Sequence, residues 1–145
     1  MSENKEQDKS AIRSVIDEWS QAIREKNVAG VMEHFAPNSV RFYMAPPLQA
    51  TMPLEENLEG WFATFQGPID YEIRDLTIVV GGDIAYCHSF NRIAGTKQDG
   101  STPDVWFRDT LCFRKIDNQW KITHAHESVP FEMEEPFHAA LDLKP

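Results

Sequence analysis

One carboxylate in the segment 104–128 stands among large apolar side chains. Read at the two-residue period of a β-strand, Asp109 shares a face with Val105, Phe107, Leu111 and Phe113. A carboxyl group in such surroundings must be paired or hydrogen-bonded, or its pKa rises until it holds a proton. Such an acid suits proton transfer to an apolar molecule, so Asp109 is the first candidate catalytic residue. The alternative is a bulge that shifts the phase of the strand, or an Asp109 that only bonds a backbone amide or an arginine.

A histidine on the preceding strand-like segment is the candidate partner of this acid. His88 alternates with Cys87 and Ser89 and shares a face with Tyr86 and Phe90. If the strands pair so that His88 lies near Asp109, the two side chains form an acid–base pair with His88 as the base. A histidine between aromatic neighbours can equally be a hydrogen-bonded structural residue, and that alternative stays open.

Two further histidines and a second carboxylate lie in the last strand-like run. His124 and His126 are two residues apart, so both point to one face together with Trp120. Two imidazoles can bind a divalent metal, but the neighbouring positions offer no good third ligand, and we expect no metal there. Hydrogen bonding at a sheet face or a subunit contact explains the histidine pair instead. Glu127 points to the opposite, concave face, either as a second interior carboxylate or as a charge at the rim.

Aromatic side chains supply enough surface to line a cavity of small-molecule size. The predicted pocket residues are Trp19, Tyr43, Trp61, Phe65, Phe90, Phe107 and Glu127. The same aromatic residues can instead fill the core. The sequence contains no glycine-rich phosphate loop, no glycine-flanked nucleophilic serine and no Cys-x-x-Cys pair, so we expect a small-molecule ligand and no cofactor.

The period of the apolar residues predicts helices in the first half of the chain and strands in the second. The expected helices cover about 8–26 and 28–36 and the stretch from Leu54 to Phe65, and the expected strands cover 39–44, 69–80, 83–95 and two more that meet near 117–118. Helices followed by long antiparallel strands are typical of an α+β domain. We therefore expect one domain over residues 1–145, with residues 1–8 frayed and residues 129–145 forming a C-terminal tail.

Charge and composition exclude several classes of partner. The 145 residues carry a formal net charge of -9, which argues against binding to nucleic acid and to anionic membranes. No apolar run approaches the roughly 18 residues that a membrane span requires. Cys87 and Cys112 lie in strand-like runs and are expected to be free thiols. A soluble cytoplasmic protein is the expectation from these features.

Several runs, taken in order, resemble the nuclear transport factor 2-like superfamily in its SnoaL-like and ketosteroid-isomerase-like branch, from about Ala11 to Ser128. Residues 35–40 read FAPNSV, which is similar to a motif near the start of the family, and residues 117–128 read DNQWKITHAHES, which is similar to its closing run. The closing run is shared with the association domain of calmodulin-dependent kinase II. The resemblance implies a cystatin-like, cone-shaped roll in which helices pack on a curved, mostly antiparallel sheet.

The resemblance also implies roles for single residues. Asp109 falls where the steroid isomerases keep a protonated aspartic acid that donates to an oxyanion. Trp19 falls at the position of their tyrosine donor, and Tyr43 at the position of their aspartate base, so that base is missing. His88 or Glu127 would have to replace it from another strand. In the kinase association domain, the positions that match His88 and Glu127 carry arginines in the pocket.

The leading hypothesis is a small-molecule-binding SnoaL-like protein. If it is an enzyme, it performs isomerisation, cyclisation, hydration or dehydration by acid–base catalysis without a cofactor. The alternative is a non-catalytic ligand-binding or oligomerisation module like the kinase association domain. We also expect a homodimer that pairs through the outer face of the sheet, because that face is too apolar and aromatic to be left in water. The predicted interface residues are Trp106, Arg108, Trp120, His124 and His126.

Overall fold

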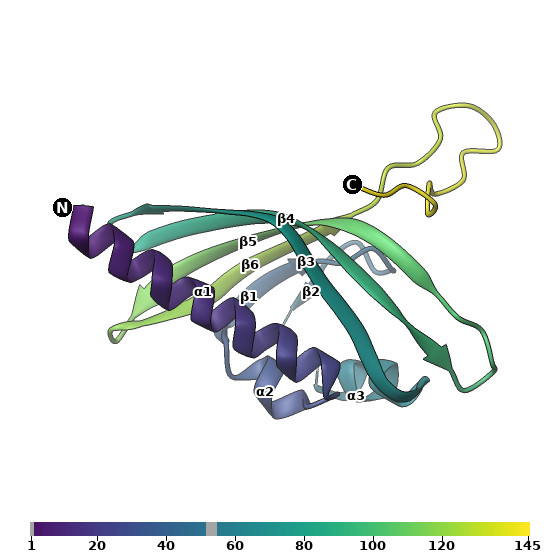
Figure 1. The fold of residues 1–145 in the computed structure, drawn as a ribbon, viewed down its shortest axis with the longest axis horizontal. Coiled ribbons are helices and arrows are strands. Elements are labelled where there is room, and N and C mark those ends of the chain that lie inside the picture. The colour runs from purple at the N-terminus through teal and green to yellow at the C-terminus, as the bar shows by residue number, and fades with distance from the viewer. Residues whose placement is uncertain (1, 52–54) are drawn as a thin grey trace.

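The computed structural model describes residues 2–51 and 55–145 and places helices on one face of a curved sheet (Figure 1). Within these residues six strands form the sheet in the order β2-β1-β6-β5-β4-β3. The strands are β1 (Phe35–Phe42), β2 (Ala50–Thr51), β3 (Phe65–Gly81), β4 (Ile84–Lys97), β5 (Asp104–Ile116) and β6 (Gln119–Ser128). Of the neighbouring pairs, β1–β6 is parallel and the others are antiparallel. The predicted α+β class and mostly antiparallel curved sheet are confirmed.

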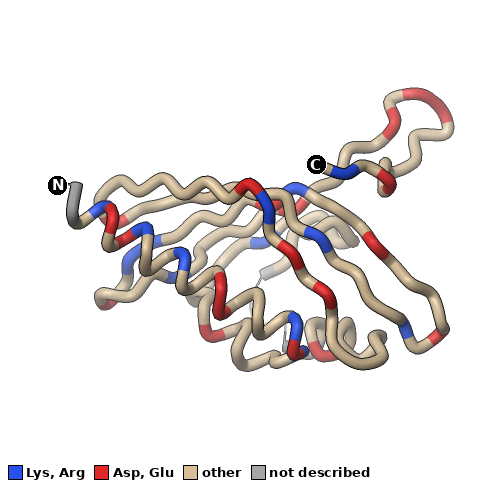
Figure 2. Tube along the Cα trace, in the orientation of Figure 1, with Lys and Arg blue, Asp and Glu red and all other residues tan. Residues whose placement is uncertain are grey.

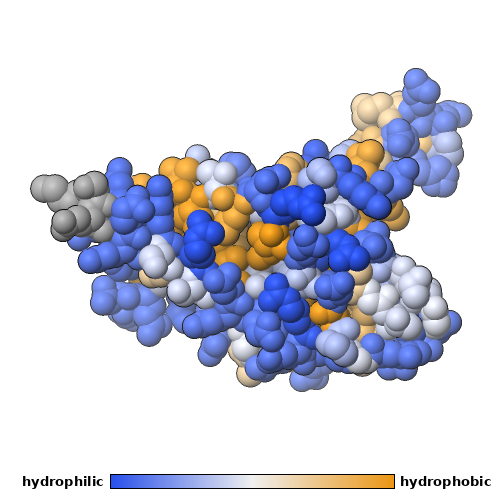
Figure 3. All heavy atoms as spheres, in the orientation of Figure 1, coloured by the Kyte–Doolittle hydropathy of each residue, from blue (hydrophilic) through white to orange (hydrophobic). Residues whose placement is uncertain are grey.

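Three helices are described: α1 (Ser2–Arg24), α2 (Val28–Met32) and α3 (Glu55–Ala63). The long helix α1 crosses the sheet diagonally in Figure 1 and buries Ile12, Ile16, Trp19 and Ile23, which follow at three- and four-residue spacing. Figure 3 shows hydrophilic side chains on the outward side of α1 and apolar ones gathered between α1 and the β3–β4 edge. The apolar stripe of α1 therefore closes the core over the sheet.

The N-terminal part of α1 differs from the expectation of a frayed end. The helix starts at Ser2, so Asp8 lies inside it. Asp8 Oδ1 accepts hydrogen bonds from Lys115 Nζ and Trp120 Nε1, both at 3.1 Å. These contacts tie the first turns of α1 to β5 and β6, which is a tertiary effect that the polar local sequence does not reveal. Leu54, expected at the start of the third helix, lies outside the described residues.

A β-bulge in β6 changes which of its side chains face the core. Cys112 on β5 pairs with His124, but the next residue, Phe113, pairs with Ile122, so Thr123 is an extra residue without an opposite partner. Before the bulge, Trp120 and Ile122 are buried in the core. The prediction that Trp120 lies on the outer face with the two histidines is therefore wrong, because a strict two-residue alternation does not hold across a bulge.

The C-terminal tail projects from the body of the protein in Figure 1 and carries acidic residues at its tip in Figure 2. It is closed by a bridge between Phe131 and Ala139 and by a hydrogen bond from Ala140 N to Pro130 O. Its end returns toward β3, where Arg74 donates to the main-chain oxygen of Pro145 at 3.4 Å. Both cysteines of the chain are free thiols. No helix in the described part of the chain is long and apolar enough to cross a membrane.

Candidate functional site

Two carboxylates from neighbouring strands lie opposite one another on the inner face of the sheet. Asp109 on β5 pairs in register with Glu127 on β6. Directly opposite residues of antiparallel strands have Cβ atoms about 4.5–5.5 Å apart, so their side chains interact. Asp109 is 3% exposed and lies between Phe107 and Leu111, which are also buried. The predicted phase of β5 is confirmed. Glu127 points to the same inner face but is only half-buried and lines a groove, so it combines the two readings left open for it, an interior carboxylate and a charge at the rim.

The two acids hold protons more strongly than free carboxyl groups do. Burial raises the pKa of Asp109 from 3.8 to about 7. Burial and the neighbouring charge of Asp109 raise the pKa of Glu127 from 4.5 to about 8. Two carboxylates in one apolar site cannot easily ionise together, so the two groups titrate as a coupled pair and not independently. At neutral pH the pair contains a proton donor beside an acceptor.

A chain of polar side chains holds Asp109 in place. Asn91 Nδ2 on β4 donates to Asp109 Oδ2 at 3.1 Å and to the hydroxyl oxygen of Tyr71 on β3 at 2.7 Å. Ser89 Oγ donates to Asn91 Oδ1 at 2.6 Å. The Asn91 contact favours the ionised acid, but desolvation of Asp109 outweighs it. Sequence reasoning missed Ser89, Asn91 and Tyr71 as site residues.

The structure separates His88 from this site. On β4 the buried side chains are Ala85, Cys87, Ser89 and Asn91, whereas His88 is exposed. In register, Ser89 pairs with Asp109 and His88 pairs with Thr110 on the other face. The predicted pairing of His88 with Asp109 is therefore wrong.

Phe90 shares the outer face with His88 and is 40% exposed, so its predicted place in the pocket is also wrong. The inner face of β4 takes small side chains because Tyr71 from β3 and Phe107 from β5 fill the space in front of it, with ring centroids 6.4 Å apart. The sequence contains a pattern that indicates which face of β4 is buried. The small residues Ala85, Cys87, Ser89 and Asn91 alternate along the strand, as one face packed closely against bulky neighbours would require.

Trp19 on α1 lies over the interior of the sheet. Its ring meets that of Tyr71 edge to face, with centroids 5.7 Å apart. Trp19 is buried, and among the described residues its indole Nε1 has no hydrogen-bond partner. A buried donor without an acceptor is costly, and a ligand oxygen would remove that cost. Among the predicted pocket residues, Trp19 is therefore the one whose buried N–H could donate a hydrogen bond to a ligand.

Tyr43 lies at the edge of the site, just after the end of β1. Its hydroxyl oxygen accepts from Arg41 Nη1 at 3.0 Å, and Arg41 is itself buried. Burial raises the pKa of Tyr43, and the charges of Glu127 and Asp109 raise it further. A groove of about 650 Å³ runs along residues 42–49 and is also lined by His126 and Glu127. Glu127 therefore belongs both to the carboxylate pair and to a groove that opens at the rim.

The remaining predicted pocket residues occupy the core. Phe107 is buried beside Tyr71. Trp61 on α3 packs against Phe65 with ring centroids 5.3 Å apart, and Lys97 Nζ lies 3.9 Å from the centroid of the Phe65 ring. For Trp61 and Phe65, the packing is that of an aromatic core cluster where α3 joins β3, one of the two readings that the sequence left open.

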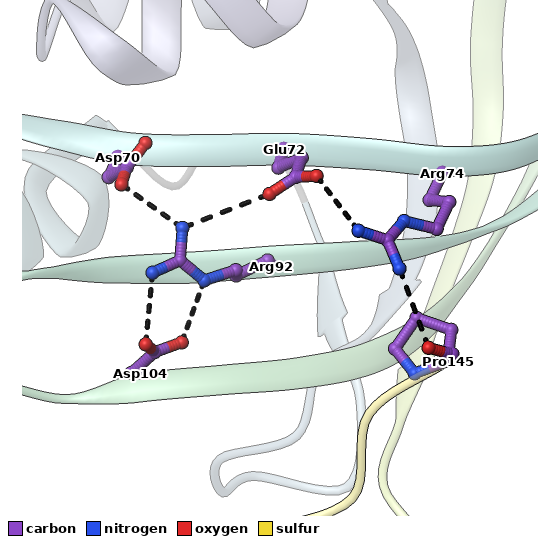
Figure 4. A network of polar contacts seen from close by, with 6 residues as sticks. All are labelled: Asp70, Glu72, Arg74, Arg92, Asp104 and Pro145. Atoms are coloured by element: carbon purple, nitrogen blue, oxygen red, sulfur yellow. Dashed lines mark hydrogen bonds and ion pairs between the residues drawn. The ribbon is translucent and has the colours of Figure 1, made fainter.

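A network of charged side chains lies on the outer face of the sheet. Arg92 donates to both carboxylate oxygens of Asp104 at 2.8 and 2.9 Å and to Asp70 at 3.1 Å (Figure 4). In the same network, Arg74 reaches the C-terminal residue Pro145. These hydrogen bonds raise the pKa of Arg92 above its usual value. The network borders the predicted interface and keeps that end of the face polar.

The predicted interface residues other than Trp120 lie on or near this outer face. Trp106 lies under the guanidinium of Arg74, whose Cζ is 4.8 Å from a ring centroid of Trp106. Arg108 Nε donates to Ser128 Oγ at 3.1 Å. His124 Nδ1 lies 2.7 Å from Val40 O, to which it donates. This hydrogen bond agrees with the expectation that the two histidines are hydrogen-bonded at a sheet face.

Comparisons with known proteins agree with this architecture. The family model described as a SnoaL-like domain matches residues 12–132. An NTF2-like protein of unknown function from Pseudomonas putida KT2440 is 32% identical, with a TM-score of 0.84, and the match covers 94% of this chain and 95% of that one. No match was found among curated proteins.

More distant solved structures share the fold. A candidate scytalone dehydratase from Novosphingobium aromaticivorans DSM 12444 is 18% identical with a TM-score of 0.79, over 100% of this chain and 99% of that one. The association domain of the Caenorhabditis elegans calmodulin-dependent kinase II is 15% identical with a TM-score of 0.66, over 86% of this chain and 98% of that one. At such identities the likeness concerns the fold alone.

Proposed function

We propose, from the premise that the chain belongs to the SnoaL-like family, that this protein binds a small, partly apolar molecule through an oxygen atom beside Asp109 and Glu127. The observation that carries the proposal is the opposed carboxylate pair, with Asp109 buried and Glu127 half-buried, in which desolvation raises the pKa of both groups. Perturbed acids in an apolar site are typical of places where protons are transferred. The proposed activity is acid–base catalysis that needs no cofactor.

Each carboxyl group has a role that its surroundings support. Asp109, whose ionised form the Asn91 contact favours, is the base, so it takes the role first assigned to His88. Glu127, which borders the groove and has the higher pKa, is the acid that donates a hydrogen bond or a proton to the ligand oxygen. The unpartnered indole N–H of Trp19 is a second donor for a ligand oxygen.

The pair suits elimination of water from a β-hydroxy carbonyl compound, or the related isomerisation. In the elimination, Asp109 removes the proton on the carbon beside the carbonyl, a carbon–carbon double bond forms, and the hydroxyl leaves as water with the proton from Glu127. The net proton balance of the pair is restored when Asp109 passes its proton to Glu127 or both exchange with solvent. The likeness in fold to a candidate dehydratase favours this reaction class as the first to test.

The groove along residues 42–49 gives the ligand a way in. It is lined by Tyr43, Met44, Pro46 and Leu48, which are apolar or aromatic and at least partly exposed. The main-chain amide of Met44 donates to Glu127. This hydrogen bond attaches the segment 42–49 to the carboxyl group of Glu127, which lines the groove. A ligand with an apolar body and an oxygen at one end would place that oxygen at Glu127 and its body along the groove.

Asp109→Asn and Glu127→Gln are expected to lower kcat on the accepted substrate by at least about a hundredfold each, the usual contribution of a positioned acid or base. Substrates would be found by measuring thermal shifts with β-hydroxy ketones, cyclic ketones and lactones, because ligands of the native state raise the melting temperature. Turnover would then be followed by the absorbance of the conjugated product.

His88→Gln is the matched control, because it removes a titratable group from the outer face of the same sheet. It is expected to leave kcat within about twofold of the parent. Loss of activity in His88→Gln but not in Glu127→Gln would contradict the roles proposed here. Full activity of both carboxylate variants would contradict the proposed function as a whole.

Assembly of two copies through the outer face is a second proposed function, supported by the exposed residues of that face. Ile84 is 59% exposed, Tyr86 46% and Phe90 40%, and they lie on neighbouring positions of one strand face with His88. Solvent-exposed apolar groups that adjoin in this way are typical of interfaces. Two structures similar in fold are association domains, one of them from a kinase.

Light scattering at micromolar concentration is expected to give the mass of a dimer, about twice the 16.6 kDa of the chain. Phe90→Glu should place a charge in the centre of the paired faces and shift the mass to that of a monomer. Leu48→Glu, a change of the same kind at an exposed residue of the groove, is the control and should remain dimeric. A parent protein that is monomeric at this concentration would contradict the proposal.

A further inference from the structure

We propose that Glu18, Glu33 and His34 bind a first-row divalent metal ion, zinc in particular, where α1 meets the junction of α2 and β1. Glu18 lies on α1, Glu33 is the C-cap of α2, and His34 directly precedes β1. One ligand atom from each residue lies within 4.8 Å of the other two. The expectation of no metal was argued from His124 and His126, which are not part of this group.

The buried member of the group, His34, has no hydrogen-bond partner for its Nε2 among the described residues. The residue is 7% exposed, and its side chain 9%. Nε2 nevertheless points at two carboxylate oxygens, 3.4 Å from Glu18 Oε2 and 3.5 Å from Glu33 Oε1. A buried ring nitrogen left without a partner is costly, and a cation between the three atoms would satisfy it and both carboxylates at once.

The two distances fit the edges of a tetrahedral coordination sphere. Zinc binds histidine nitrogen and carboxylate oxygen at about 2.0–2.2 Å, so neighbouring ligand atoms of a tetrahedron lie about 3.3–3.5 Å apart. The side chains of Glu18 and Glu33 are 66% and 65% exposed, so they can rotate to close the third edge. Three protein ligands would leave the fourth position to water.

The donor set decides which cations fit. One imidazole and two carboxylates suit zinc and its neighbours in the first transition row, whereas magnesium and calcium prefer oxygen ligands alone. Lys121 lies beside the group, and its Nζ donates to the main-chain oxygen of Glu33 at 2.7 Å. Burial lowers the pKa of His34, which keeps the ring in the neutral form that binds metals.

A metal at this point would join α1 to the end of α2 and the start of β1. The main-chain oxygen of His34 accepts from Ile122 N at 2.8 Å, so the site is already attached to β6 in the core. A bound ion would hold α1 against His34 and thus against β6, at a position next to Trp19 on the inward side of the same helix. Because the ion binds the folded chain, it should raise the free energy of unfolding.

Calorimetric titration of metal-free, untagged protein with zinc chloride is expected to show one equivalent bound, with a rise in melting temperature. Glu18→Gln and Glu33→Gln should each weaken zinc binding by at least about tenfold, since each removes one ligand. Both residues are exposed, so these variants should remain folded. Magnesium and calcium should bind at least about tenfold more weakly than zinc.

Glu6→Gln, at an exposed position of the same helix, and His126→Ala should bind zinc like the parent. Equal zinc affinity of the parent, Glu18→Gln and Glu33→Gln would overturn the site, as would the absence of zinc binding to the parent. Loss of the bound zinc in His126→Ala would move the site to the histidine pair on β6. Binding of magnesium or calcium as strong as that of zinc would show that His34 is not a ligand.

Discussion

The free energy of unfolding is expected to fall by several kcal/mol between about pH 5 and pH 9, because Asp109 and Glu127 must ionise inside the fold over that range. Burial raises the pKa of Asp109 to about 7 and that of Glu127 to about 8. In the unfolded chain both groups lose their protons near their ordinary values. The native state therefore binds more protons across this range, and stability decreases as pH rises.

Stability decreases with rising pH because both carboxyl groups have a raised pKa in the folded state. An acid with a raised pKa in the folded state contributes its full stability below the pKa of the unfolded chain and loses it as pH rises through the folded value. The groups that share this interior do not titrate there: burial raises the pKa of Tyr43 and Tyr71, and that of Cys87 to about 12.

Asp109→Asn is expected to remove about half of this pH dependence and to be more stable than the parent near pH 9. The amide keeps an oxygen that can accept from Asn91 but cannot ionise. Chemical denaturation at a series of pH values measures the difference between the two proteins, which cancels contributions from His34 and other groups. Parallel curves for the parent and Asp109→Asn would contradict a raised pKa at Asp109.

The carboxylate at the centre of this prediction could be found from the sequence because its strand alternates without interruption. Along β5 the residues Phe107, Asp109, Leu111 and Phe113 are all buried, as the two-residue period requires. The apolar stripe of α1 was equally visible, because three- and four-residue spacing is a local property of the chain. Both features depend only on neighbours in sequence.

The partner of Asp109 could not be chosen from the sequence, because it depends on the register between strands. A shift of one residue would place His88 beside Asp109, but the register that forms pairs Ser89 with Asp109 and Glu127 with Asp109. Asn91 was hidden for the same reason. Its polarity suggested the solvent side, and only the positions of Tyr71 and Asp109 explain why an amide is fully buried there.

The bulge at Thr123 was the other feature beyond local reasoning. The run from Trp120 to Ser128 alternates well enough to suggest one uninterrupted strand, yet Ile122 and Ala125 both face the core. The bulge shows in the pairing of β5 with β6, as the register shift between Cys112 and Phe113 and the hydrogen bond from Thr123 Oγ1 to Cys112 O at 3.2 Å. The extra residue lets Trp120 and Glu127 both point inward although they are an odd number of positions apart.

Deletion of Thr123 is therefore expected to leave the fold intact. Without the extra residue, Trp120, Ile122, Ala125 and Glu127 follow one another at a strict two-residue period, so all four still face the core and the pairs Cys112–His124 and Phe113–Ile122 become consecutive. The deletion removes the hydrogen bond from Thr123 Oγ1 to Cys112 O, which contributes about 1 kcal/mol. Thermal unfolding followed by circular dichroism should show a cooperative transition close to that of the parent.

Two controls separate the register of β6 from other effects of a deletion. Thr123→Ala keeps the bulge and loses only one hydrogen bond, so it should melt cooperatively with a loss of about 1 kcal/mol. Deletion of Thr102, an exposed residue in the connection between β4 and β5, shortens the chain without changing a strand and should also leave a cooperative transition. Loss of the cooperative transition in the chain without Thr123, but not in these two controls, would contradict the description of Thr123 as an extra residue, because the core would then depend on the bulge itself.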